Sequence, residues 1–169
     1  MKKRILMVLL AIFRISSAMA ENYQLDDGIT LNEENAKYSI LLSTDESVEL
    51  NSLYDNGVVV RYSDESNNPT GLGKFVEVEY RMGFEFEGTF VEAGVMRMLF
   101  SNLEEVFVTG EQDISKGDPM CLSRKGPEGD LRVFILSDTA DLQFLEVRTQ
   151  NRKVELDGLW YWDPSFLFQ

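Results

Sequence analysis

The sequence of 169 residues contains no histidine and one cysteine. Without histidine the chain cannot form a serine–histidine or cysteine–histidine nucleophile pair, a histidine general base or a zinc site with a histidine ligand. One cysteine excludes an intrachain disulfide and a zinc site made of thiolates. Cys121 lies in the apolar stretch of residues 119–122, so we expect a buried, unreactive thiol rather than a reactive or intermolecular one.

Short signatures of other catalytic and binding sites are also missing. The sequence has no Ser-x-x-Lys, no acidic loop with EF-hand spacing and no complete phosphate-binding pattern around Gly71 and Gly73. The 29 acidic residues leave an enzyme with paired carboxylates open as a class, but no spacing singles out a pair. We therefore expect no cofactor and a function based on binding.

The first twenty residues have the pattern of a cleaved signal peptide. Three cations at residues 2–4 precede an apolar run at residues 5–13, and the segment closes with Ala18-Met19-Ala20. A retained membrane anchor is the alternative, but this run is much shorter than the roughly twenty residues that cross a bilayer as a helix. No cysteine follows the cleavage site to carry a lipid. We expect a mature chain that begins near Glu21 and is periplasmic or secreted.

The net charge of the chain limits the classes of partner that it can bind. Removal of the four cations in residues 1–20 takes the formal net charge from −13 to −17. Such a charge repels phosphate backbones and anionic lipid headgroups, so nucleic acid and membrane insertion after signal cleavage are not expected. The length after cleavage suits one domain. We divide it into an acidic N-terminal arm at residues 21–36 and a β domain at residues 37–169.

Short β-prone runs separated by glycine, aspartate and asparagine predict an all-β, single antiparallel domain. Residues 63–70 are predicted to form a loop. For residues 99–105, a short helical turn is an alternative to a strand. Trp160-Tyr161-Trp162 either packs a C-terminal segment onto the sheet or forms a stacking platform for sugar or peptide. The predicted strands are residues 38–42, 57–62, 76–87, 105–109, 119–123, 131–137, 142–149 and 153–156.

Residues 76–87 carry the clearest pattern. Their even positions are apolar and their odd positions are charged or glycine, which is typical of a strand with one buried and one wet face. We expect Val76, Val78 and Tyr80 on the buried face and the charged positions 77, 79 and 81 on the wet one. Gly83 is expected to mark a bend, bulge or turn.

Several segments, in order along the chain, resemble the M23 (LytM-type) peptidoglycan endopeptidases. Residues 98–120 resemble the family's tyrosine-alanine-histidine-leucine, strand and glycine-rich hairpin, although that hairpin is also similar to biotinyl/lipoyl-type domains. Residues 142–148 look like its histidine-leucine-histidine-phenylalanine-glutamate-valine-arginine strand, and Asp163-Pro164 looks like its closing aspartate-proline. Residues 55–59 and 71–76 look like two of its earlier strands. The resemblance implies an M23/LytM-like, duplicated hybrid motif-like fold.

The resemblance also implies that the zinc site has been lost. The family binds zinc with a histidine and an aspartate four residues apart and with the second histidine of the histidine-x-histidine strand. Leu142 and Phe144 stand at the two histidine positions of that strand. Their side chains offer a metal no lone pair, so the resemblance implies a pseudoenzyme without metal. The positions of the vestigial cleft would be Asn102, Leu142, Phe144, Lys37 and Leu41.

A cleft of this kind either fills with its own side chains or stays open as a groove for a peptide or protein segment. The resemblance implies a catalytically inactive periplasmic protein that regulates or scaffolds a peptidoglycan hydrolase, or that binds cell-wall peptide. The rival expectation is an acidic inhibitor or immunity-type protein that blocks a basic envelope hydrolase by electrostatic complementarity.

Overall fold

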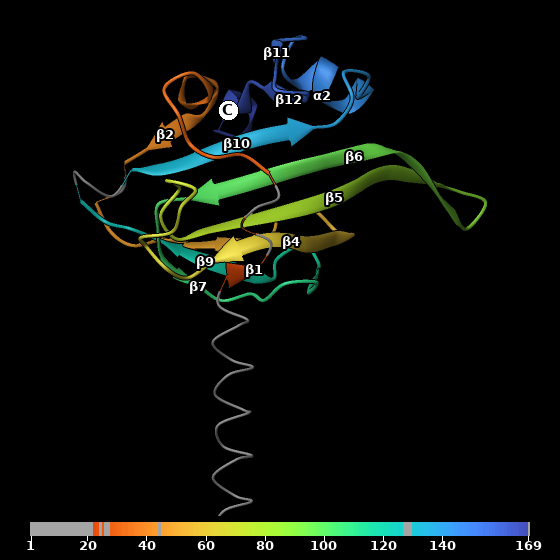
Figure 1. Ribbon diagram of the computed structural model, residues 1–169. Helices are drawn as coiled ribbons and strands as arrows, with labels where there is room; N and C mark the ends of the chain where they lie inside the picture. The colour runs from red at the N-terminus through yellow and green to blue at the C-terminus, as the bar shows by residue number, and fades with distance from the viewer. Residues whose placement is uncertain (1–21, 24, 26–27, 44, 127–129, 169) are drawn as a thin grey trace, which may run out of the picture.

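The structure is a computed structural model that describes residues 22–23, 25, 28–43, 45–126 and 130–168. The predicted signal peptide lies outside these residues. Most of the described chain is antiparallel β-structure, which confirms the all-β prediction (Figure 1). The predicted boundary at residue 36 falls inside a 3-10 helix, η1 (Asn35–Tyr38), and Ile29 of the expected arm is buried.

The larger of two sheets has the strand order β1-β4-β5-β6-β10-β12-β11, with β2 also paired to β10 and β8 to β4. Neighbouring strands run antiparallel, and β5 and β6 form a long hairpin that projects beyond the rest of the sheet (Figure 1). These strands are β1 (Asn22–Tyr23), β2 (Ile40–Leu42), β4 (Gly57–Ser63), β5 (Phe75–Phe86), β6 (Thr89–Ser101), β8 (Asp113–Ile114), β10 (Leu131–Ser137), β11 (Lys153–Leu156) and β12 (Leu159–Trp162).

The smaller sheet has the order β3-β9-β7 and covers part of one face of the larger sheet. Its strands are β3 (Glu49–Asn51), β7 (Leu103–Val106) and β9 (Pro119–Ser123). Cys121 of β9 is buried in the core between the sheets, as expected, and burial raises the pKa of its thiol to about 12. The thiolate form needed for reactivity is therefore absent at neutral pH.

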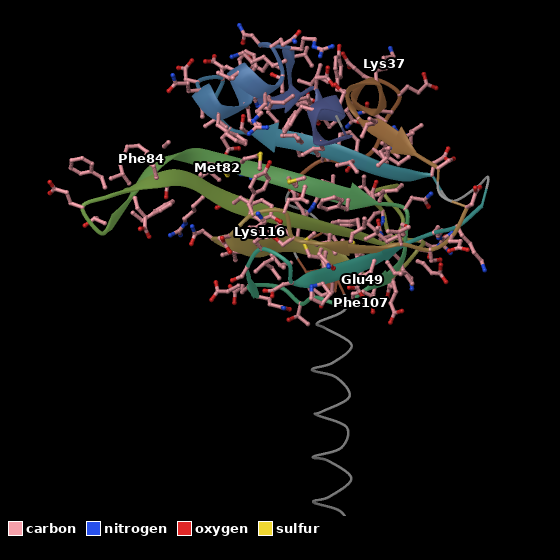
Figure 2. The ribbon with its side chains drawn as sticks, turned by 180° about the vertical axis from the view of Figure 1, so that it is seen from behind. Lys37, Glu49, Met82, Phe84, Phe107 and Lys116 are labelled. Carbon is pink, nitrogen blue, oxygen red and sulfur yellow. The ribbon has the colours of Figure 1, made fainter. Side chains whose placement is uncertain are left out.

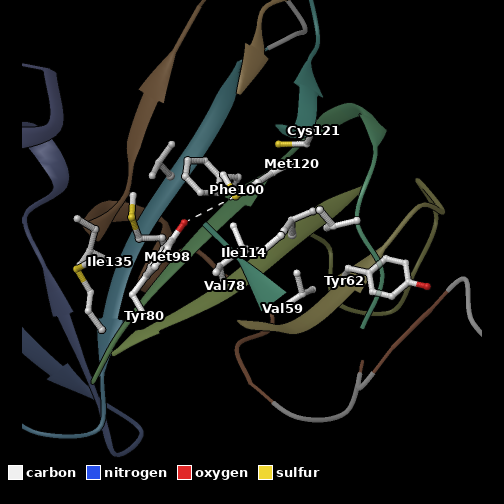
Figure 3. Close-up of a cluster of buried hydrophobic side chains, with 14 of the residues drawn as sticks. Val59, Tyr62, Val78, Tyr80, Met98, Phe100, Ile114, Met120, Cys121 and Ile135 are labelled. Atoms are coloured by element: carbon white, nitrogen blue, oxygen red, sulfur yellow. Dashed lines mark hydrogen bonds between the residues drawn. The ribbon is translucent and has the colours of Figure 1, made fainter. Parts of the chain in front are cut away.

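The predicted strand at residues 76–87 is confirmed in its buried face. Val76, Val78 and Tyr80 of β5 are completely buried and pack against β6 and the smaller sheet (Figure 3). The Tyr80 hydroxyl is 2.8 Å from the Ser52 hydroxyl, so its polar end is satisfied inside the core. The register shifts between Met82 and Gly83, which is the irregularity expected at this glycine.

The prediction for Glu77 was wrong, because this carboxylate is buried rather than wet. Its Oε2 lies 2.9 Å from Nε of Arg61 on β4, and both side chains are almost fully enclosed. The guanidinium also donates to the Ile29 carbonyl and stacks on Phe75. Burial raises the pKa of Glu77, while the adjacent Arg61 lowers it. The second face of the sheet is therefore covered as well; Arg81 alone of the three charged positions is exposed.

The N-terminal segment around Ile29 packs against this second face. A second apolar cluster there includes Ile29, Leu99, Phe134 and Tyr161. Trp162, which points to the opposite face, donates its indole N–H to the Ser137 hydroxyl at 2.8 Å. The cluster at residues 160–162 is thus a strand of the sheet, which confirms the packing alternative over the stacking platform.

Two local predictions were wrong. Residues 142–149 were expected to be a strand, but residues 143–148 form the helix α2 (Gln143–Arg148). The buried residues Leu145 of the helix and Leu142 and Thr149 at its two caps are spaced three and four apart, and such spacing places side chains on one helical face. The alternative helical turn around residues 99–105 is instead the end of β6 followed by β7. A last 3-10 helix, η2 (Pro164–Phe168), closes the described chain.

Candidate functional site

The five predicted cleft residues lie in three separate hollows. Leu41 and Asn102 line one, Leu142 and Phe144 line a second, and Lys37 lines a third. The structure therefore brings Leu41 and Asn102 together but places Phe144 elsewhere, because α2 lies beside β5 and β6 and away from the end of β6 that carries Asn102.

The first hollow, which we call the β10 hollow, has a volume of about 390 Å³. Leu41 of β2 is the register partner of Arg132 on β10, and Ser101 of β6 is the partner of Arg132 on the other side. Asn102 follows β6 directly. Pairing of three strands that are distant in sequence thus places these side chains at one edge of the sheet, next to Asp130.

Hydrogen bonds fix the polar groups of the β10 hollow. The Asn102 amide donates to the Asp130 carbonyl at 3.0 Å, and the Ser43 hydroxyl donates to the Asp130 carboxylate. Nη1 of Arg132 donates to the Ser39 hydroxyl at 2.6 Å and to the Ala36 carbonyl at 3.0 Å. Partial burial lowers the pKa of Arg132, and the neighbouring Asp130 raises it. The hollow therefore contains one cation beside one anion.

Asn102 has a backbone φ of +61°, a conformation that asparagine tolerates better than most residues. Its N–H donates to the Leu72 carbonyl at 2.9 Å. These constraints hold the side chain toward Asp130 and the loop at Gly73. Asn102 is therefore a rigid part of the hollow.

The side chains of the β10 hollow do not fit a zinc ion. Leu41 has no donor atom, and the Arg132 guanidinium has no lone pair and stays a cation. Asn102 and Asp130 are already hydrogen-bonded. Among the residues that the structure describes, no three His, Cys, Asp or Glu side chains gather as a metal site.

The second hollow, which we call the hairpin groove, has a volume of about 630 Å³ and lies between the β5–β6 hairpin and α2. Leu142 packs directly on the backbone at Gly94, where a Cβ would lie 2.2 Å from Leu142 Cδ2. Phe144 packs its ring edge against Tyr54 with centroids 6.0 Å apart, and Arg148 lies over the Phe144 ring. Leu142 is thus core, whereas Phe144 lines the groove and is half-buried.

Large apolar side chains beyond the groove are open to solvent. Phe84 and Phe86 of β5 are 58% and 60% exposed, and Phe90 of β6 is 42% exposed. Val147 of α2 is 72% exposed. Figure 2 shows Phe84 on the projecting hairpin, far from the exposed Phe107 on the opposite side of the molecule. The β5–β6 hairpin and α2 together form the most prominent apolar surface of the described chain.

The third hollow has a volume of about 510 Å³ and is lined by Lys37. Several of its other lining residues contact one another. Arg152 and Asp163 pair across it at 3.0 Å. The Lys153 ammonium lies 4.6 Å from the Trp162 ring centroid and donates to the Ala140 carbonyl. These interactions fasten β11 to its neighbours, and they do not converge on a shared open point.

Comparisons with protein-family models, with curated proteins and with solved structures find no match. No helix in the described part of the chain has the length and apolar character to span a bilayer.

Sequence reasoning missed Asp130 and Arg132 of the β10 hollow. The signal was present in Asp130-Leu131-Arg132-Val133, where polar residues alternate with buried ones on a strand. It also missed the exposed hairpin, because the same alternation predicts a buried face along all of residues 76–86.

Proposed function

We propose that this protein is a catalytically inactive relative of the M23 endopeptidases that regulates or scaffolds a peptidoglycan hydrolase in the cell envelope, or binds the wall peptide. The observation that carries the proposal is the β10 hollow. The resemblance places Leu41 near one residue of the lost zinc pair and Asn102 at the position of a histidine that assists catalysis, and these two residues lie in one hollow although they are distant in sequence.

In this proposal β10, not residues 142–149, takes the place of the histidine-leucine-histidine-phenylalanine strand. Asp130 and Arg132 then occupy the two histidine positions, with Leu131 and Val133 as the apolar residues between and after them. Two facts support the new alignment. Asp130 and Arg132 line the same hollow as Leu41 and Asn102, and residues 143–148 are helical.

An arginine at a metal-ligand position favours binding over hydrolysis. Zinc-dependent peptidases need the metal to acidify a water and to polarise the scissile carbonyl. A guanidinium repels a metal cation, but it can donate hydrogen bonds to a carboxylate or a carbonyl of a bound peptide. Asp130 beside it can accept from an amine or an amide. The hollow therefore suits recognition of a short polar segment.

A cleavage assay tests this function. The mature protein from Glu21 onward, incubated alone with labelled peptidoglycan, is expected to release no fragments. When added to a purified envelope hydrolase, it is expected to change the rate of release. Leu41 is 49% exposed, so Leu41→Glu should abolish this effect without unfolding the protein. Leu53→Glu, at another leucine that is 44% exposed, is the matched control. Chelator-sensitive cleavage by the protein alone would overturn the proposal.

The acidic inhibitor is a second candidate, and the β5–β6 hairpin favours it. Residues 82–94 contain Glu85, Glu87 and Glu92 and no cation. A projecting acidic hairpin has a shape that can enter a basic cleft. In the same assay an inhibitor of this kind only lowers the rate, loses its effect as salt is raised, and is insensitive to Leu41→Glu.

A further inference from the structure

The end of the β5–β6 hairpin, residues 83–92, is the part of the large sheet that extends beyond its cover; we call it the hairpin tip. On β5 the apolar alternation of Val78 and Tyr80 continues to Phe84 and Phe86, past the register shift with β6 between Met82 and Gly83. The first two are completely buried, and the last two are 58% and 60% exposed. An apolar face that continues past the core into solvent is typical of a docking surface.

Strand pairing determines which side chains of the tip share a face. Phe84 pairs with Val91 and Phe86 with Thr89 across the hairpin, so these four side chains share one face. On the opposite face Phe90 packs over Gly83, where a Cβ would lie 2.6 Å from the Phe90 ring. The turn at Glu87 and Gly88 has φ values of +49° and +76°, as tight hairpin turns require.

The hairpin groove extends this surface to α2. Met82 and Phe84 line it from β5, and Phe144 and Val147 line it from α2. Val147 is 72% exposed, and Leu145 is the buried residue of α2. The tip and the groove thus form one apolar surface, long enough for an extended or helical segment to lie along it.

Charge decides what kind of segment fits. Glu85 pairs with Phe90 and Glu92 with Gly83, so these two carboxylates lie on the face of the tip opposite Phe84 and Phe86, and Glu87 lies in the turn. No lysine or arginine occurs in residues 82–94, so the tip as a whole is anionic. Arg148 lines the groove at its α2 end, where it lies 5.4 Å from the Phe144 ring centroid. A second copy of this chain, with a formal net charge of −13, would bring like charges together. An anionic bilayer would repel the tip for the same reason.

We propose that the hairpin tip and the groove beside α2 bind a segment of a partner protein that presents apolar side chains flanked by lysine or arginine. Phe84, Phe86 and the groove provide the buried contact, and the net negative charge of the tip, whose glutamates lie on its reverse face and in its turn, favours a basic segment over an acidic one. This inference rests on the proposed function only in requiring that the protein acts by binding; the β10 hollow plays no part in it.

Two synthetic amphipathic helices test the selectivity. They share one pattern of leucines, and one carries lysine and the other glutamate at every polar position. Titration calorimetry should show binding of the lysine peptide to the full mature protein and none of the glutamate peptide. Phe84→Ser with Phe86→Ser should weaken binding by roughly tenfold or more. Phe107→Ser, at an aromatic that is 40% exposed on the other side, should leave it unchanged. Equal binding of both peptides, or no effect of the Phe84 and Phe86 changes, would overturn the inference.

A photo-crosslinking amino acid at position 86, in the full chain made in its own cells, identifies the natural occupant. The expected product is a crosslink into a segment of another protein that carries a net positive charge. A crosslink into lipid, into a second copy or into an acidic segment would overturn the inference, and so would the absence of any crosslink. A basic segment of a protein that is not a wall hydrolase would support the inference and contradict the proposed function. A wall hydrolase that is crosslinked through an acidic segment would support the proposed function and contradict the inference.

Discussion

The two ends of the β5–β6 hairpin carry apolar side chains at the same alternate positions, yet one end is core and the other is surface. Val78 and Tyr80 at the base are completely buried, whereas Phe84 and Phe86 at the tip are more than half exposed. The cover of the base comes from the smaller sheet and α2, which are distant in sequence and end before the tip. Alternation identifies a common face of a strand, but separate elements decide whether that face is covered.

Truncation of one aromatic at each end should separate base from tip most clearly. Tyr80→Ala is expected to lower the free energy of unfolding by about 4 kcal/mol, because it leaves a cavity and removes the partner of Ser52. Phe86→Ala, on the same face of the same strand, should change it by less than about 0.5 kcal/mol. Urea denaturation of both variants measures the difference. Similar losses at the two positions would mean that the tip is part of the folded core.

The glutamates of β5 provide the second test. Glu77→Ala leaves the buried Arg61 without this carboxylate and should cost about 3 kcal/mol or more. Glu85→Ala at the tip should cost nothing measurable. Replacing both members of the buried pair, with Arg61→Met and Glu77→Leu, should recover most of the lost stability, because no charge then remains to be paired. A double variant as unstable as Glu77→Ala would show that shape rather than charge governs this site.

Alkaline pH should destabilise the buried base of the β5–β6 hairpin and leave the hairpin tip unaffected. Burial raises the pKa of Cys121 from 9.0 to about 12 and that of Tyr80 from 10.0 to about 12. The unfolded chain therefore releases these protons first, so stability is complete below about pH 9 and is lost as pH rises toward 12. The loss should be about 1.4 kcal/mol per pH unit for each group. In Cys121→Ala the decline should begin one unit higher, as urea unfolding between about pH 8 and about pH 11 would show.

The smallest effect on global stability is expected at the turn. Gly88 has a φ of +76°, and a Cβ there meets no other atom, so Gly88→Ala should cost about 1 kcal/mol locally. Amide exchange at the tip should accelerate while the urea midpoint stays the same. Gly94→Ala is the counterpart near the base, where the new Cβ would strike Leu142. It should lower the global stability by about 1–3 kcal/mol. A shift of the midpoint in Gly88→Ala would contradict the separation of tip from base.

Local pattern was sufficient for β4, β9, β10 and β11 and for the buried face of β5, because neighbours in sequence determine which side chains share a face. It did not identify β3, β6 or β12 as strands. Glu77 could not be placed this way, since its partner Arg61 lies on another strand and its cover comes from residues near Ile29. The helix α2 was predicted as a strand because Leu142 and Phe144 alternate. The buried set at positions 142, 145 and 149 is helical, and that spacing was available in the sequence.

The residues of the candidate sites also divide into those that the sequence predicts and those that only the tertiary structure brings together. Leu41 and Asn102 were placed together by the order of motifs, and the structure also places them together. Asp130 and Arg132 join them only through the pairing of β10 with β2 and β6, which no local pattern specifies. The hairpin tip could not be recognised from sequence, because exposure depends on where the covering elements end.

The turn at Glu87 and Gly88 also has a consequence for the order of folding. β5 and β6 are adjacent in sequence and pair over their whole length, so this hairpin closes a two-residue loop, as short as the one between β11 and β12, and should form early. β10, which must cover β6, joins only after a much longer loop has closed. In that interval the apolar face of the hairpin is an aggregation hazard, and Glu85, Glu87 and Glu92 are placed as charged gatekeepers against it. Neutral glutamines at these three positions should lower the yield of refolding at high protein concentration, although the native protein gains or loses little stability.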